Sequence, residues 1–120
     1  MKENIIKNKS FAFAIRVIKL CEYLRNEHKE FILAKQLLRS GTAIGALVRE
    51  SEQAESKPDF IHKMSIALKE ASETDYWLEL LFKSEYLKEI EYTSMKEDND
   101  EILRLLVSII KTAKSNSGKL

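Results

Sequence analysis

The chain has 120 residues, of which 44% are hydrophobic and 32% are charged, and its formal net charge at pH 7 is +1. This length predicts a single domain, residues 1–120, with a core of its own. The balanced charge excludes a protein that binds polyanions through its overall charge alone. With one proline and three glycines, the composition favours long helices over many short strands.

No apolar run approaches the roughly 20 residues that cross a bilayer, so we expect no membrane association. The first residues, Met1–Ile6, lack the apolar core and the cleavage site of a signal peptide. The lone cysteine, Cys21, has no partner for an internal disulfide, which is typical of a reducing compartment. These features predict a cytoplasmic location.

The first helix is predicted over about residues 10–26, with Ser10 as its N-cap. Its apolar residues form two rows that together cover more than half of the circumference. The row that would form the core of a single bundle consists of Phe11, Ala14, Ile15 and Ile18. The row left without a partner, a candidate oligomer interface, consists of Phe13, Val17, Leu20 and Leu24.

The second helix is predicted over about residues 32–54 from apolar or small residues that recur every three or four positions. Gly41 and Gly45 lie inside it, and each costs about 1 kcal/mol relative to alanine. We infer that these glycines let another helix pack closely. A different face of the same helix carries the basic residues Lys35, Arg39 and Arg49.

The third helix is predicted over about residues 57–87, with Ser56 as the N-cap and Asp59 completing a capping box. One apolar stripe is interrupted by Thr74 and Asp75, and we expect a basic side chain from a neighbouring helix to pair with Asp75. A second stripe is a further candidate interface and consists of Ile66, Trp77 and Leu80.

A second capping box, Ser94 to Glu97, predicts a fourth helix over about residues 95–113. Four such helices with short polar connections predict an all-α, antiparallel up-down-up-down four-helix bundle. The first, third and fourth helices carry more apolar circumference than one bundle can bury. The sequence therefore also predicts a homo-oligomer.

Catalytic and metal sites are not expected. A di-iron bundle needs a Glu-x-x-His motif on each of two helices, whereas the nearest match here, Asp59-x-x-His62, occurs once. The carboxylates Glu70, Glu73 and Glu79 suit structural pairing better than acid–base chemistry. There is no phosphate-binding glycine loop or nucleophile elbow, so we expect a non-enzymatic protein without a cofactor.

The basic residues are the candidate nucleic-acid-binding site. Lys35, Arg39 and Arg49 share one face of the second helix, and Arg16 and Lys19 form a similar face on the first. Such faces are consistent with an ordinary solvated surface. They are also consistent with phosphate binding, since a homo-oligomer would repeat the patch several times.

Three segments resemble motifs of a known family. They are Lys35-Gln36-Leu37-Leu38-Arg39-Ser40-Gly41-Thr42-Ala43-Ile44-Gly45-Ala46 and Ile66-Ala67-Leu68-Lys69-Glu70-Ala71-Ser72-Glu73-Thr74-Asp75-Tyr76-Trp77-Leu78, together with Asp59-Phe60-Ile61-His62-Lys63. The family is that of the proteins encoded in intervening sequences of bacterial 23S ribosomal RNA genes. Its members are often labelled ribosomal proteins. The resemblance covers roughly residues 10–110.

The resemblance implies a four-helix bundle that assembles as a homopentameric ring and has a role in nucleic-acid binding. Our first hypothesis is that it binds structured RNA in preference to DNA through phosphate contacts. The family resembles in fold the accessory variability protein of diversity-generating retroelements, a protein that binds nucleic acid and a reverse transcriptase. The sequence departs from the family pattern at Ala43, where serine is common, and at Leu47, where asparagine is common. Because that relative binds an enzyme, the alternative function is a protein-interaction module, an accessory subunit of a nucleic-acid enzyme such as a reverse transcriptase.

Overall fold

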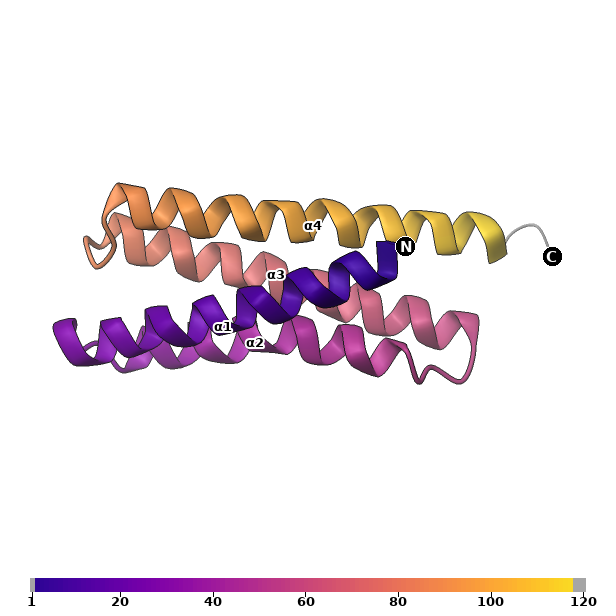
Figure 1. The fold of residues 1–120 in the computed structure, drawn as a ribbon, viewed down its shortest axis with the longest axis horizontal. Helices are drawn as coiled ribbons and strands as arrows, with labels where there is room; N and C mark the ends of the chain where they lie inside the picture. Colours follow the sequence, from indigo (N-terminus) through magenta and orange to yellow (C-terminus); the bar gives the residue numbers. More distant parts are fainter. Residues whose placement is uncertain (1, 118–120) are drawn as a thin grey trace.

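The computed structural model describes residues 2–117, and these residues form a bundle of four long helices (Figure 1). These are α1 (Lys2–His28), α2 (Ile32–Ser51), α3 (Lys57–Lys83) and α4 (Glu89–Ser117). Consecutive helices run in opposite directions, which confirms the predicted all-α four-helix bundle. The ring assembly stays a prediction.

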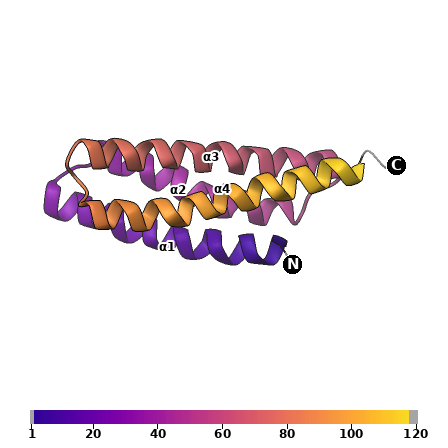
Figure 2. The ribbon, with the colours of Figure 1, turned by 90° about the horizontal axis from the view of Figure 1, so that it is seen from above.

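Each helix packs against two neighbours. α1 contacts α2 and α4, and α3 also contacts α2 and α4, whereas α1 and α3 do not meet. Figure 2 shows α1 and α3 on opposite sides of α4. The α1–α2 side of the bundle is therefore opposite its α3–α4 side.

The first helix starts earlier than predicted, at Lys2. Ser10 is not an N-cap, because it is buried inside the helix and its hydroxyl donates to the Lys7 carbonyl at 3.3 Å. Ile6 is fully buried and continues the apolar face of α1 toward its start. Lys7 also forms an ion pair with Glu52 of the α2–α3 connection at 3.2 Å. These contacts explain why the helix extends beyond the predicted start.

The third helix begins as predicted. The Ser56 hydroxyl accepts the Asp59 backbone N–H at 3.1 Å, and the Asp59 carboxylate accepts the Glu55 backbone N–H at 3.2 Å. In a capping box this carboxylate would accept the backbone N–H of the N-cap, Ser56, whereas here it accepts that of the preceding residue, Glu55. The preceding helix, α2, ends at Ser51, a few residues before the predicted end.

The boundaries between the third and fourth helices were predicted incorrectly. α3 ends at Lys83, because Glu85 adopts a positive φ of 69° and the Tyr86 N–H bonds to the Leu81 carbonyl at 2.9 Å. α4 begins at Glu89 and not near residue 95. The carboxylate of Glu91 accepts the Lys88 backbone N–H at 3.0 Å at this start.

The two apolar rows of α1 are exchanged relative to the prediction. The row assigned to an oligomer interface lies in the core of the single chain: Phe13, Val17 and Leu24 are buried and Leu20 is partly buried. The row assigned to the core is exposed: Phe11, Ile15 and Ile18 expose 52%, 46% and 44% of their surface. The interface prediction is therefore wrong for Phe13, Val17 and Leu24, whereas for the half-buried Leu20 it stays a prediction.

Small residues explain this exchange. Ser10 and Cys21 lie on the same face of α1 as Val17, and they meet the α2 backbone at Gly45 and Ala34. The Cys21 thiol donates to the Ala34 carbonyl at 3.2 Å. The opposite row offers bulky side chains at these levels and would hold the two helices apart.

The two glycines of α2 permit the close packing that their positions predict. A Cβ at Gly41 would lie 2.8 Å from the Val17 Cγ2 atom, closer than carbon atoms approach. A Cβ at Gly45 would lie 3.4 Å from the Ser10 carbonyl oxygen, which is ordinary contact. Gly41 is therefore the position at which the close contact with α1 leaves no room for a side chain.

The second stripe of α3 is only partly exposed. Ile66, Trp77 and Leu80 are half-buried, and Trp77 packs against the core. The Trp77 indole N–H donates to the Glu73 carboxylate at 3.0 Å, so its polar group is satisfied within the chain. A contact of this stripe with another copy stays a prediction.

Candidate nucleic-acid interface

The candidate cations of α2 differ in their surroundings. Lys35, Arg39 and Arg49 all point away from the core. The Arg39 guanidinium lies 3.1 Å from a Glu70 carboxylate oxygen and also pairs with Glu73, both on α3. The hydrogen bond with Glu73 is the main cause that raises the pKa of Arg39 above its usual value. Arg39 is thus a cross-link between α2 and α3.

Glu73 is held by two donors. Its pKa is lowered first by the hydrogen bond from the Trp77 indole and then by the hydrogen bond from Arg39. Both helices therefore contribute to one surface network in which the carboxylate stays charged. The predicted structural role of Glu70 and Glu73 agrees with these contacts, which run across the α2–α3 boundary.

The second arginine of the candidate set is also paired. The Arg16 guanidinium lies 2.5 Å from the Asp98 carboxylate and 2.8 Å from the Ser94 hydroxyl, both on α4. The Ser94 side chain, predicted to cap a helix, accepts this hydrogen bond inside α4. Arg16 therefore joins the first helix to the last, and its charge is balanced within the chain.

Three candidate cations remain available to a ligand. Lys19, Lys35 and Arg49 are exposed, and no ion pair among residues 2–117 includes them. Lys19 lines an open groove of about 430 Å³ between α1 and α4. The Arg49 guanidinium lies 5.0 Å from the centroid of the Phe11 ring, a cation–π contact across α1 and α2.

The exposed row of Phe11, Ile15 and Ile18 on α1 is a surface that the sequence reasoning missed. Phe11 lies beside Arg49 of α2, whereas Ile15 lines the open groove between α1 and α4. The signal that could have identified this row is the pair of small residues, Ser10 and Cys21, on the opposite row. Small residues mark the face along which helices approach closely.

Asp75 has the partner that the sequence could not identify. The Lys96 ammonium of α4 lies 3.1 Å from the Asp75 carboxylate and 3.4 Å from Asp100. The hydrogen bond with Asp75 is the first cause that raises the pKa of Lys96. This pairing confirms a structural role for Asp75 on the flank between α3 and α4.

The remaining residues with reactive or metal-binding side chains include Cys21 and His62. Within the part of the chain that the structure describes, no group of three or more His, Cys, Asp or Glu residues could hold a metal ion. Burial raises the pKa of the Cys21 thiol to about 11, so the thiol stays protonated at neutral pH. His62 is exposed.

None of the helices in the described range is long and apolar enough to cross a bilayer. This finding agrees with the absence of long apolar runs in the sequence.

The chain is similar to known proteins both in sequence and in fold. The 23S rRNA-intervening sequence protein family matches residues 2–108. A 1.70 Å crystal structure of a protein of unknown function from the S23 ribosomal protein family of Bacteroides thetaiotaomicron is similar in fold, with a TM-score of 0.91. That protein is 57% identical, and the match covers 92% of this chain and 99% of that chain. No curated protein matches the chain. The chain therefore belongs to the 23S rRNA-intervening sequence protein family.

Proposed function

We propose that the protein is a non-enzymatic, homo-oligomeric helical bundle that binds nucleic acid, structured RNA in preference to DNA, in the cytoplasm. The observation that carries this proposal is a set of exposed cations on α1 and α2 that form no ion pair with any residue in the range 2–117: Lys19, Lys35 and Arg49. Such cations contact phosphates without reading sequence. Arg16 and Arg39 have a smaller part, because carboxylates already neutralise them.

Self-association is the second part of the proposal. Phe11, Ile15 and Ile18 form one exposed apolar row, and contiguous apolar surface of this kind marks protein interfaces. The resemblance to the family favours a five-fold ring. A ring would present several copies of the free cations to one RNA, so that modest single contacts add up.

A salt titration of RNA binding tests the proposal. For the wild type we expect the logarithm of the binding constant to fall linearly with the logarithm of the salt concentration. The variant Lys35→Gln/Arg49→Gln should bind more weakly, with a shallower slope. Arg39→Gln, on the same helix, is the comparison and should change the slope less than the double variant does, because carboxylates already neutralise Arg39. Absent or salt-insensitive binding by the wild type would reject the proposal.

The exposed row on α1 favours a second candidate, an accessory subunit of a nucleic-acid enzyme such as a reverse transcriptase. An apolar row flanked by Arg49 suits a protein partner as well as a second copy. A pull-down from nuclease-treated lysate separates the two functions. Recovery of one such enzyme by the wild type, and its loss with Ile15→Asp, would support the accessory role.

A further inference from the structure

The charges of α4 are segregated along its length. Its first part, residues 89–101, contains six acidic residues: Glu89, Glu91, Glu97, Asp98, Asp100 and Glu101. Its remaining part, residues 102–117, contains no acidic residue and three basic ones: Arg104, Lys111 and Lys114. The helix therefore ends in a segment with a net positive charge, although the chain as a whole is almost neutral.

The two parts of α4 also differ in their ion pairs. In the acidic part, Asp98 and Glu101 pair with Arg16 and Lys9 of α1, and Asp100 pairs with Lys96. In the basic part, no ion pair among the described residues includes Arg104, Lys111 or Lys114. Three of the six carboxylates, Asp98, Asp100 and Glu101, are thus paired with cations of the described residues, whereas the three cations are left to solvent.

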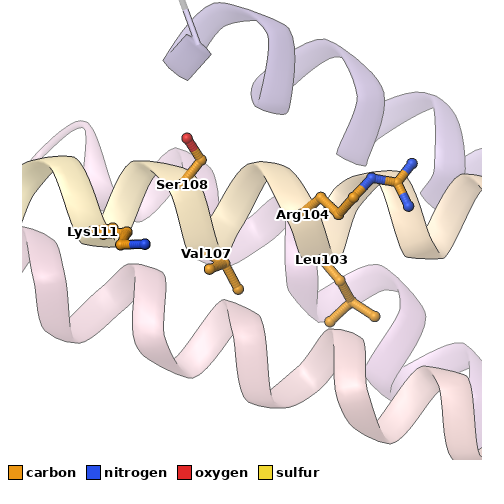
Figure 3. A pocket seen from close by; sticks show the side chains of 5 residues that line it. All are labelled: Leu103, Arg104, Val107, Ser108 and Lys111. Carbon is orange, nitrogen blue, oxygen red and sulfur yellow. The ribbon is translucent and has the colours of Figure 1, made fainter.

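Two of these cations line a shallow groove of about 410 Å³ (Figure 3). Arg104 and Lys111 lie toward its two ends, and the side chains between them are Leu103, Val107 and Ser108. Val107 exposes 49% of its surface. No carboxylate lines the groove. A ligand seated here would meet positive charge at both ends and an apolar floor between them.

All five residues that line the groove belong to α4, so it lies on the outward face of that helix. Leu103 and Val107 follow Lys96 by seven and eleven residues, so all three share one helical row, and Lys96 contacts Asp75 of α3. One edge of the groove therefore borders α3, while Arg104 and Ser108 point toward the α1 side (Figure 3). The groove is separate from α2, the helix of Lys35 and Arg49, because α2 and α4 do not contact each other.

The spacing of the cations suits a phosphate backbone. Arg104 and Lys111 are two helical turns apart, a rise of about 10 Å along the axis. Phosphates follow one strand of a duplex at about 3.4 Å of axial rise each, so this span covers about three phosphates. An arginine adds a planar, bidentate donor to one of them.

We propose that the groove formed by Arg104, Lys111, Leu103 and Val107 binds the phosphate backbone of a nucleic acid. It is a contact surface separate from the α1–α2 face. This inference rests on the proposed function and adds a second surface to it. Arg104 and Lys111 hold two phosphates of one strand, and Val107 packs against the sugar between them.

The test compares two pairs of substitutions that change the net charge equally. Arg104→Gln/Lys111→Gln removes the groove cations, and Lys83→Gln/Lys88→Gln removes two exposed cations near the other end of α4. Fluorescence anisotropy with a labelled RNA hairpin, measured over a range of salt concentrations, gives the slope for each protein. Loss of two phosphate contacts should make the slope shallower by roughly 1.4 to 1.8, from about 0.7 per contact on single strands to about 0.9 on B-form DNA.

The control pair should keep the wild-type slope, and Arg104→Lys should retain most of the binding because it keeps the charge. Circular dichroism shows whether each variant is folded. If the groove variant and the control pair have the same slope while the wild type binds, the inference is overturned and the proposed function stands. If the wild type binds no RNA at any salt concentration, the proposed function and this inference both fail.

Discussion

Val17 of α1 lies directly over Gly41 of α2, so close that a Cβ at residue 41 would lie 2.8 Å and 2.9 Å from the two Val17 methyl carbons. This contact positions the first helix on the second, and it buries Val17 completely. It also turns the row of Phe11 and Ile15 outward. The composition of the exposed α1–α2 surface thus depends on a single missing side chain.

Gly41→Ala should lower the thermal stability. Val17 is β-branched and cannot rotate out of the way without strain, and overpacking a core costs about 1–3 kcal/mol. That cost exceeds the gain in helix propensity of about 1 kcal/mol. The melting temperature, followed by circular dichroism, measures the difference.

Gly45→Ala is the matched control for this prediction. Its new Cβ would meet the Ser10 carbonyl oxygen at 3.4 Å, so the gain in helix propensity should prevail and the melting temperature should rise. An equal rise with Gly41→Ala would show that Val17 does not constrain that position.

We expect a double-mutant cycle of Arg39 and Glu73 to show a favourable coupling energy. We also expect the free energy of unfolding to fall slightly in acid because of Glu73. Exposed ion pairs contribute about 0.2–1 kcal/mol. The folded-state pKa of Glu73 is lowered, so its contribution is present above the unfolded pKa of about 4.3 and is lost as the pH falls through the lowered value. The raised pKa of Arg39 lies too high to matter here.

Urea unfolding at neutral pH and again at acid pH measures this effect. Glu73→Gln should remove part of the stability difference between the two conditions. The control is Glu97→Gln, an exposed residue of α4 that enters no ion pair among residues 2–117. If both variants show the same pH dependence, the network around Glu73 contributes nothing to stability.

Cys21 should be unreactive in the folded protein. Its thiol is buried, donates to the Ala34 carbonyl, and has a pKa raised to about 11. Because the folded pKa is raised, its contribution to stability is complete below the unfolded pKa of about 8.5 and is lost as the pH rises toward 11. Iodoacetamide should label Cys21 slowly at neutral pH and rapidly in urea. Fast labelling of the folded chain would contradict the burial of this thiol.

Lys29 and Glu85 should be sites of stabilising glycine substitutions. Both have positive φ angles, 55° and 69°, at positions after helix ends where glycine is preferred. A left-handed conformation costs a residue with a Cβ about 1–2 kcal/mol. Lys29→Gly and Glu85→Gly should therefore raise the midpoint of urea unfolding. Glu27→Gly, inside α1, is the control and should lower it by a cost of about 1 kcal/mol.

Local signals in the sequence determined the number of helices and the start of α3. The Ser56 hydroxyl and the Asp59 N–H are three residues apart, and such a cap forms within one turn whatever surrounds it. The glycines of α2 and the expected cation beside Asp75 were also predictable. A mid-helix glycine and a partly buried carboxylate each require compensation, which the sequence makes visible.

Only the tertiary structure decided which apolar row of α1 is buried and which cations are free. Both rows have helical spacing, so periodicity could not choose between them; the fit of Val17 to Gly41 did. The ion pairs of Arg39 join residues 31 and 34 positions apart. Such pairs depend on how two helices are rotated and aligned against each other, and the pattern within one helix carries no information about that.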